Sequence, residues 1–253
     1  MNRIIRGGYN RINRLIKFIL FKLKYPNVPV VRPLAVGTFY SQDGQDLFLS
    51  SLLFNYLTNN SSSWIVDVGC NHPQHFSNSL FFERAFNCRT LAVDPLVEFS
   101  DLWANQRPSA IFINAAIGGT PNSVVLRVPS GTNADNMFAA LEGGHFKKEL
   151  GGDYIERTVR CMKLSELFES HCITEVLLLS IDVEGFELEV LKTIDLKKCM
   201  IRCIVLENNS CSLYGSDDIR EYLHSLDFAF YARIGVLDDV FVHSSLMNGR
   251  NAY

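Results

Sequence analysis

WIVDVGCNHPQHFSN, residues 64–78, is the stretch that decides the fold class. Its first five residues are mainly apolar and β-branched, which is typical of a strand buried on both faces of a parallel sheet. The strand ends at Gly69, where a ligand can approach the backbone closely, and Asp67 can accept hydrogen bonds from a ligand amine or hydroxyl. A strand that turns into a helix is where doubly wound sheets bind nucleotide-like ligands. The alternative is a plain strand end, with Asp67 bound only to backbone amides.

The loop after this strand lacks the glycine pattern that binds a pyrophosphate. A GxGxxG loop would place two further glycines after Gly69, but Cys70, Asn71 and His72 follow it. The loop therefore favours a ligand without phosphate groups. Asn71 joins the candidate ligand-binding residues.

Composition predicts one large domain with extensions, and the charge is unevenly distributed. The 253 residues are 47% hydrophobic and carry a net charge of −3. Residues 1–42 hold eight Lys and Arg and no acid, so the other 16 basic and 27 acidic residues give the body a charge of −11. Such an acidic body argues against a nucleic-acid partner. The seven cysteines include no CxxC pair, which favours a reduced, cytoplasmic protein over a disulfide scaffold.

Residues 3–24 predict a basic amphipathic helix. Apolar residues recur at helical spacing between lysines and arginines: Ile12, Leu15, Ile16, Ile19, Leu20 and Leu23. The run is too short to span a bilayer. Two interpretations remain: the helix lies on the anionic inner face of a membrane, or it packs on the body or on a second subunit of a homo-oligomer. Prolines in residues 25–39 predict a linker, so residues 1–39 form an extension and residues 40–253 the main domain.

Residues 90–94, TLAVD, predict the next strand and end in a second acid. Asp94 follows Asp67 by 27 residues, which is where an acid in a doubly wound fold accepts both ribose hydroxyls. The alternative is that Asp94 caps a helix over residues 96–106, and the two roles are compatible.

An insertion is predicted after the third strand. Residues 110–117 read as that strand, and Asn114–Ala116 at its end would flank a flat ring. Residues 123–128 and 154–161 predict antiparallel strands of an inserted hairpin. Between them, residues 130–153 are rich in Gly and Asn and long for a loop, which indicates a lid or a substrate-facing segment.

A second stretch with candidate site residues is EVLLLSIDVEGFELEVL, residues 175–191. Its buried strand ends at Asp182, and Glu184 lies in the turn before a helix. The following strand ends in Glu207 and Asn208. Acids that meet at a ligand-binding edge need a metal, a bound cation or a role as a base. Helix capping is the alternative for Asp182 and Glu184.

Two further segments complete the domain. SQDGQD, residues 41–46, predicts a helix start with Ser41 or Asp43 as the N-cap, and has a smaller chance of touching a ligand. Residues 228–234 and 240–243 predict a closing antiparallel pair of strands.

With these motifs in place, the sequence resembles the FkbM family of S-adenosylmethionine-dependent methyltransferases. IVDVGCN is similar to the first motif of that family, LAVDP to its ribose-binding strand, and LLLSIDVEGFELEVL followed by IVLEN to its signature. SQDGQD with HPQHFSNS is similar to a subgroup. The likeness covers roughly residues 40–210, and it departs from the family at Cys70 and His72–Pro73, where Ala and a later Gly are typical.

The resemblance implies a class I fold, a doubly wound, seven-stranded Rossmann-like α/β sheet whose last two strands lie in residues 228–243. It also implies methyl transfer to a hydroxyl of a small-molecule or glycan acceptor, often a sugar or a glycosylated natural product. The implied cofactor-binding residues are Asp67, Gly69, Asn71, Asp94, Asn114 and Ala115. The implied acceptor-side, catalytic residues are Asp182, Glu184 and Glu207.

A weaker resemblance concerns a metal. In catechol-type O-methyltransferases an acid after the fourth strand and an acid–Asn pair after the fifth hold magnesium, and Asp182 with Glu207 and Asn208 is similar to that set. The rival function is a catalytically silent protein of this fold that acts as a scaffold on a membrane. An NAD-dependent oxidoreductase is a distant third, because the glycine pattern is missing.

Overall fold

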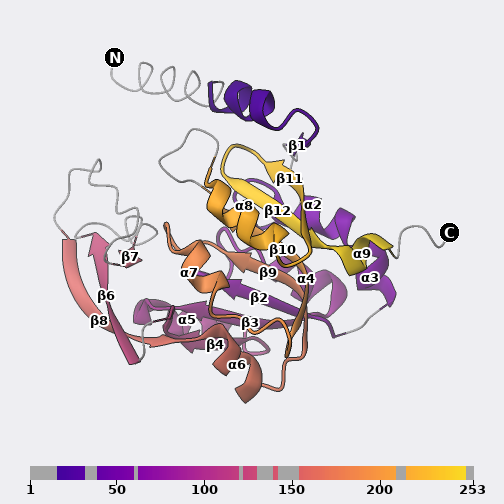
Figure 1. The fold of residues 1–253 in the computed structure, drawn as a ribbon. Coiled ribbons are helices and arrows are strands. Elements are labelled where there is room, and N and C mark those ends of the chain that lie inside the picture. Colours follow the sequence, from indigo (N-terminus) through magenta and orange to yellow (C-terminus); the bar gives the residue numbers. More distant parts are fainter. Residues whose placement is uncertain are drawn as a thin grey trace, which may run out of the picture.

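The computed structural model describes residues 16–31, 39–59, 62–119, 122–129, 139–141, 154–208 and 215–248. It is a mixed α/β structure with two sheets, and Figure 1 shows helices around the larger one. The strands of the larger sheet are, from edge to edge, β1 (Val30–Val31), β11 (Phe228–Ile234), β12 (Asp238–His243), β10 (Met200–Glu207), β9 (Glu175–Ile181), β2 (Trp64–Val68), β3 (Arg89–Asp94) and β4 (Ile111–Asn114).

Five neighbouring strands, from β4 to β10, run parallel, so their carboxyl ends share one edge of the sheet. That edge carries Asp67 near the end of β2, Asp94 at the end of β3 and Asp182 just after β9. β12 runs antiparallel to both of its neighbours. A large mixed sheet of this kind fits the α/β fold that the resemblance implies.

The sheet has eight strands where the resemblance implies seven. The additional strand, β1, comes from the segment that we predicted as an extended linker. Val30 and Val31 pair in parallel with Arg233 and Ile234 of β11. The backbone N–H of Arg233 also donates to the carbonyl oxygen of Pro29 at 2.8 Å. Because valine suits a pleated edge, the segment extends the sheet by one short strand.

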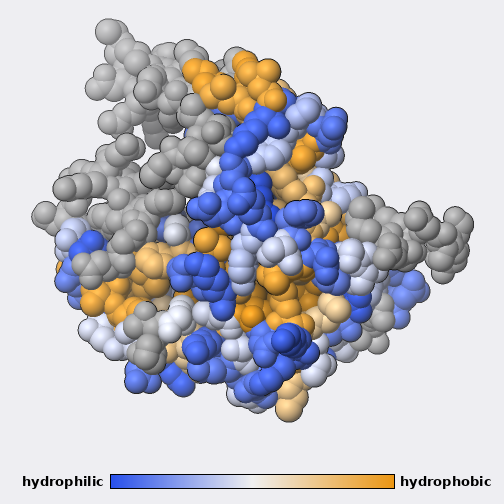
Figure 2. Space-filling view, viewed as in Figure 1, coloured by the Kyte–Doolittle hydropathy of each residue, from blue (hydrophilic) through white to orange (hydrophobic). Residues whose placement is uncertain are grey.

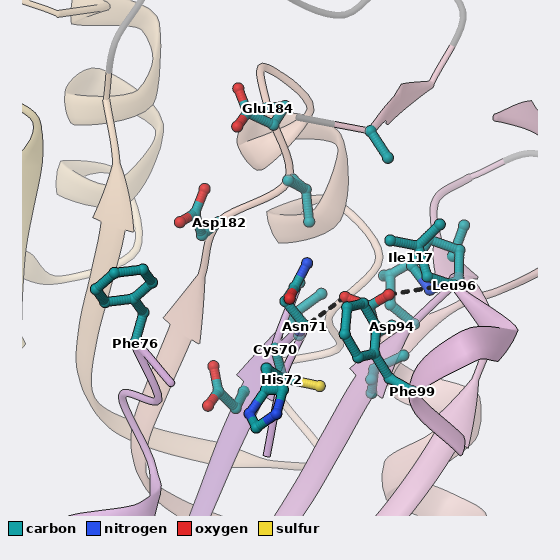
Figure 3. A pocket seen from close by; sticks show the side chains of 18 of the residues that line it. Cys70, Asn71, His72, Phe76, Asp94, Leu96, Phe99, Ile117, Asp182 and Glu184 are labelled. Atoms are coloured by element: carbon teal, nitrogen blue, oxygen red, sulfur yellow. Dashed lines mark hydrogen bonds between the residues drawn. The ribbon is translucent and has the colours of Figure 1, made fainter. Parts of the chain in front are cut away.

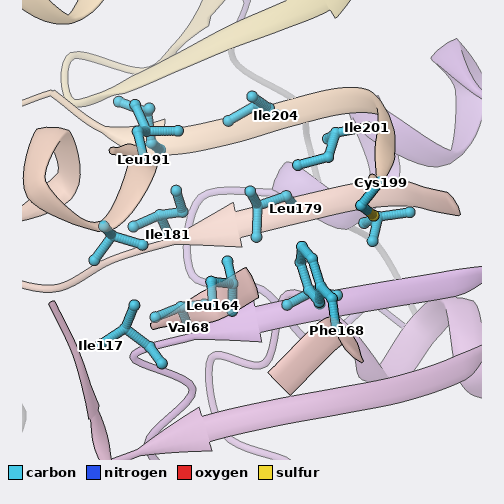
Figure 4. Packing of buried hydrophobic residues seen from close by; sticks show 14 of the residues in the cluster. Val68, Ile117, Leu164, Phe168, Leu179, Ile181, Leu191, Cys199, Ile201 and Ile204 are labelled. Carbon is cyan, nitrogen blue, oxygen red and sulfur yellow. The ribbon is translucent and has the colours of Figure 1, made fainter. Parts of the chain in front are cut away.

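Apolar side chains cover both faces of the sheet, because successive residues of a strand point to opposite sides. Val66 and Leu179 belong to a cluster on one face, part of which Figure 4 shows, and Ile65 and Leu178 to a cluster on the other. The first face packs on α6 (Leu164–Ser170), α7 (Glu187–Leu191) and α8 (Asp217–His224), and the second on α2 (Gln45–Leu52), α3 (Phe54–Asn59) and α4 (Leu80–Phe86). The site therefore stands on a rigid, two-sided core.

The insertion forms the second sheet. Its strands are, in order, β5 (Ala116–Ile117), β8 (Tyr154–Met162), β6 (Asn122–Pro129) and β7 (Ala140–Leu141). β6 and β8 pair antiparallel over their whole length, as the predicted hairpin requires. The strand predicted for residues 110–117 is split, because the chain leaves the large sheet at Ala115, whose N–H donates to the Asp94 carbonyl oxygen at 3.1 Å. Most of the predicted lid, residues 130–138 and 142–153, lies outside the described residues.

Residues 16–24 of the predicted amphipathic helix are helical, while residues 3–15 lie outside the described part. One side of this helix packs on the body: Phe21 is 2% exposed, and its ring meets Phe230 edge-on at 6.0 Å. Lys24 also pairs with Asp217 at the start of α8. Among the residues described, no helix combines the length and the hydropathy needed to cross a membrane.

The start of α2 differs from the prediction. Gly44, in the left-handed conformation, takes the N-cap position in place of Ser41 or Asp43. The Asp46 carboxylate in the first turn instead accepts the hydroxyl of Ser41 and the backbone N–H of Tyr40. These bonds hold the SQDGQD segment in a compact loop beside the sheet edge.

Candidate functional site

A cavity of about 440 Å³ lies at the carboxyl ends of β2, β3 and β9 (Figure 3). The loops that follow these three strands form most of its wall, and the SQDGQD segment and the inserted sheet form the rest. The candidate residues that line it are Asp67, Gly69, Asn71, Asp94, Ala115, Asp182 and Glu184. Most of the residues that the sequence singled out from separate motifs thus share one cavity.

Gly69 is where the two motif-bearing strand ends touch. The Asp182 N–H donates to the Val68 carbonyl oxygen at 2.9 Å, and Gly69 has a φ of +80°. A Cβ atom on Gly69 would lie 1.8 Å from the Asp182 carbonyl oxygen. We predicted that this glycine lets a ligand approach the backbone, but the close approach of the neighbouring strand end already requires a glycine here.

Asp94 is a buried acceptor held by two backbone donors. One carboxylate oxygen accepts the N–H of Asn71 at 2.8 Å, and the other accepts the N–H of Leu96 at 2.8 Å. Burial raises the pKa of Asp94 to about 6, although the two N–H donors act to lower it. Leu96 precedes η1 (Val97–Phe99) and α5 (Ser100–Gln106), so Asp94 does fasten the start of the predicted helix. Each carboxylate oxygen keeps a second lone pair for a ligand hydroxyl.

Two buried oxygens in the cavity wall have no donor among the described residues. They are Oδ2 of Asp67, a side chain that is 3% exposed, and Oδ1 of Asn78. Burial raises the pKa of Asp67, while the Ser79 hydroxyl and the charge of Arg107 act to lower it. A buried acceptor without a donor costs about 1–3 kcal/mol. A donor group of a ligand, such as an ammonium, would satisfy either oxygen.

Arg107 supports this part of the wall, and the sequence analysis missed it. The side chain is 2% exposed and donates to Glu83 at 2.7 Å, and also to the Pro73 carbonyl and the Ser79 hydroxyl. It thereby fixes residues 73–79, several of which line the cavity. Its hydrogen-bond partners lie 17 to 34 residues away in the chain, so no local pattern marks it.

Carboxylates gather at the other end of the cavity, which Asp182 and Glu184 line, while Glu207 is not among the described residues that line it. Asp182, Glu184 and Glu207 each have an oxygen within 4.8 Å of those of the other two. Asp182 is accessible from the cavity, but the protein around it limits its hydration. Although the residue is exposed, this partial loss of hydration raises the pKa of Asp182 well above its usual value, and the charges of Glu207 and Glu184 raise it further.

Two more acids border this cluster. Burial and the charge of Glu207 raise the pKa values of Glu187 and Asp238 to about 7. Gln45 of the SQDGQD segment donates to Asp238 at 2.8 Å and also lines the cavity. The segment thus supports the acidic end of the site, beyond the capping function that we favoured for it.

Asn208, which was predicted as a metal ligand, is hydrogen-bonded to other parts of the chain. Its side-chain oxygen accepts the Ser216 N–H at 2.6 Å, and its amide donates to the Asp239 carboxylate at 2.8 Å. Glu184, which was predicted on the acceptor side, lies beside Asp182 and Glu207.

Asn114 is also placed differently from its prediction. Its side chain donates to the Asp94 carbonyl oxygen at 3.0 Å, and it is not among the described residues that line the cavity. The wall there is apolar and comes partly from the insertion. It consists of Phe99, Leu102, Ala115, Ile117, Leu126 and Leu141.

Three non-glycine residues in the wall have left-handed backbones: Asn71, Phe76 and Glu184, with φ values of 47°, 57° and 54°. Such conformations are strained in bulky residues and concentrate at functional sites. Figure 3 shows Phe76 near Asp182, away from Asp94 and Phe99. The Phe76 side chain is 51% exposed and so presents an open ring beside the carboxylates.

The chain matches the model of a known protein family. Residues 67–230 match the family model described as the methyltransferase FkbM domain, which is more than half of the chain. The matched region begins at Asp67 and contains all three strand-end acids of the cavity. No curated protein sequence matches the chain significantly.

Proposed function

The chain belongs to the FkbM methyltransferase family, and from that premise we propose that it transfers a methyl group from S-adenosylmethionine to a hydroxyl of a sugar, a glycan or a glycosylated natural product. The observation that carries the proposal is the meeting of Asp67, Asp94 and Asp182, from the ends of three adjacent parallel strands, in one cavity. An amino acid, a ribose and a reacting hydroxyl each need such a polar group.

The cavity wall fits the parts of S-adenosylmethionine. Asp67 and Asn78 offer the donor-free oxygens that an ammonium would satisfy. Asp94 offers lone pairs to two ribose hydroxyls, and the apolar wall around Phe99 suits a flat heterocycle. When bound, the cofactor supplies an activated methyl group on its sulfonium. The task of the chain is then to hold the acceptor oxygen in line with that methyl carbon and to manage one proton.

On the acceptor side we assign the proton to Asp182. With the cofactor bound, the acceptor oxygen would bond to the methyl carbon as the sulfonium C–S bond breaks and S-adenosylhomocysteine leaves, and the hydroxyl proton would pass to the Asp182 carboxylate. A raised pKa suits this role, because a base works best when its pKa lies near the working pH. Glu184 and Glu207 keep the pKa of Asp182 raised and orient the acceptor through further hydrogen bonds.

A divalent cation is the alternative for the same three carboxylates. Ligands that are all oxygen favour magnesium or calcium. A cation there would lower the pKa of the acceptor hydroxyl, and no strong protein base would be needed. Activity that is lost in EDTA and restored by magnesium supports the cation, and activity indifferent to EDTA supports Asp182 as the base.

A thermal-shift assay of the full-length protein tests the cofactor. We expect S-adenosylhomocysteine at 100 times its Kd to raise the Tm by roughly 5–10 °C, since it adds about 2.7 kcal/mol. NAD should have no effect. Stabilisation by NAD alone would identify an oxidoreductase, and the absence of any shift would favour the catalytically silent scaffold.

A further inference from the structure

The helix over residues 16–24 has apolar side chains on two opposite sides. Phe21 faces the body, where Phe230 and the guanidinium groups of Arg220 and Arg233 surround its ring. Ile16, Ile19 and Leu23 are 43%, 46% and 74% exposed. Their spacing of three and four residues places them on one stripe, roughly opposite Phe21. Figure 2 shows apolar side chains at this place on the surface.

Contacts to the body hold this outer stripe (Ile16, Ile19 and Leu23) in its outward orientation. Lys24 pairs with Asp217, and the Tyr25 hydroxyl donates to the same carboxylate. Lys22 donates to the carbonyl oxygens of Pro26 and Val28, which fastens the C-terminal end of the helix. Turning the stripe inward would break these bonds and expose Phe21. The chain therefore presents the stripe permanently to its surroundings.

The charge around the stripe distinguishes between possible occupants. Residues 1–42 carry eight basic and no acidic side chains, while the rest of the chain carries −11. A symmetric contact between two copies of this helix would place positive charge against positive charge. An anionic lipid surface needs only a narrow apolar stripe with basic neighbours.

We propose that the outer stripe inserts into the headgroup region of an anionic membrane, with the body held on the surface through Phe21 and Lys24. The positive end of the molecule would face the lipid, and the acidic body would face away from it. The inference is independent of the proposed methyl transfer, because none of these side chains lines the cavity.

Flotation of the full-length protein with lipid vesicles tests this attachment. The vesicles contain phosphatidylcholine alone or a mixture with phosphatidylglycerol, at low and at physiological salt. We expect binding only to the mixed vesicles and weaker binding at higher salt. The double variant Ile19→Glu with Leu23→Glu should bind at least tenfold less.

A matched control changes exposed apolar residues elsewhere. Phe54 and Ile155 are 54% and 46% exposed, and Phe54→Glu with Ile155→Glu adds the same negative charge. This control should float like the wild type, and all three proteins should show similar Tm values. The proposal fails if the wild type ignores the mixed vesicles, if both double variants bind equally, or if the stripe variant binds normally. A dimer that dissociates only in the stripe variant, without flotation, would overturn it in favour of a second copy.

Discussion

Asp94 and Asp182 follow the two strands that flank β2, at the same edge of the sheet, yet their surroundings differ. Asp94 meets two backbone N–H donors, which fix its oxygens as acceptors. Asp182 meets Glu184 and Glu207, which oppose its ionisation. The same residue type at equivalent positions is thus prepared for two tasks, one to receive fixed hydrogen bonds and one to exchange a proton or hold a cation.

Asp67, on the strand between them, has surroundings that differ from those of both other acids. It is buried near a guanidinium that serves other partners, and one of its oxygens has no donor among the described residues. Loss of hydration raises the pKa of all three acids, while the neighbouring groups determine what each can do. Substitutions at each position should therefore have different consequences.

The largest effect is expected at the acidic end. Asp182→Asn should lower methyl transfer by about 10²–10⁴-fold, because it removes the proton acceptor or a cation ligand. Transfer of labelled methyl from S-adenosylmethionine into an extract of the source cells measures this. Calorimetric binding of S-adenosylhomocysteine should be nearly unchanged, and Asp218→Asn, an exposed acid on α8, is the matched control. Near-normal turnover of Asp182→Asn would show that Asp182 neither accepts the proton nor holds a cation needed for methyl transfer.

The second largest effect is expected on the unfolding free energy, when Arg107 no longer supports the cavity wall at residues 73–79. Arg107→Met should lower the free energy of unfolding by about 3–5 kcal/mol, since it leaves Glu83 without its buried partner. Urea denaturation measures the loss. The double variant Arg107→Met with Glu83→Gln should recover part of it. If the single variant is as stable as the wild type, Arg107 does not hold residues 73–79 in place.

Asp94→Ala should weaken S-adenosylhomocysteine binding by about 1–3 kcal/mol, because ribose hydroxyls would lose their acceptor. Asp94→Asn should weaken it less, since one acceptor oxygen remains for a backbone N–H. Calorimetric titration measures this affinity on variants whose circular dichroism matches that of the wild type. Unchanged affinity in a folded Asp94→Ala protein would remove this residue from the ribose site.

The smallest effect is expected on the pH dependence of the unfolding free energy, through the acids that border the Asp182 cluster. Asp238 and Glu187 have folded-state pKa values of about 7, above those of the unfolded chain. Their stabilising contribution is complete below pH 4 and is lost as the pH rises through 7, because the folded state holds protons that the unfolded state has released.

Asp238→Asn should therefore flatten the decline of the unfolding free energy between pH 5.5 and 8, by up to about 1.4 kcal/mol per pH unit. Denaturation of EDTA-treated, cofactor-free protein measures the two slopes. His72, whose pKa burial lowers, acts in the opposite sense in both proteins and cancels in the comparison. Identical slopes would show that Asp238 is not held protonated.

Local patterns were sufficient for the central strands. The buried apolar runs predicted β2 and β9, and the strand predicted for residues 228–234 is β11. Asp67 and Asp182 followed from the same reasoning, because the end of a parallel strand marks the ligand-binding edge. Each of these features depends on residues adjacent in the chain.

Tertiary contacts decided the rest. Whether Val30–Val31 forms a strand depends on β11, some 200 residues later, and the break at Ala115 depends on the Asp94 carbonyl. The hydrogen bonds of the Asn208 side chain join it to Ser216 and Asp239, which lie 8 and 31 residues further along the chain. The sequence determined which acids stand at strand ends, because hydrophobic periodicity is local. Only the folded structure decided which partners each acid meets, because hydrogen bonds and charges act through space between segments that the chain order does not bring together.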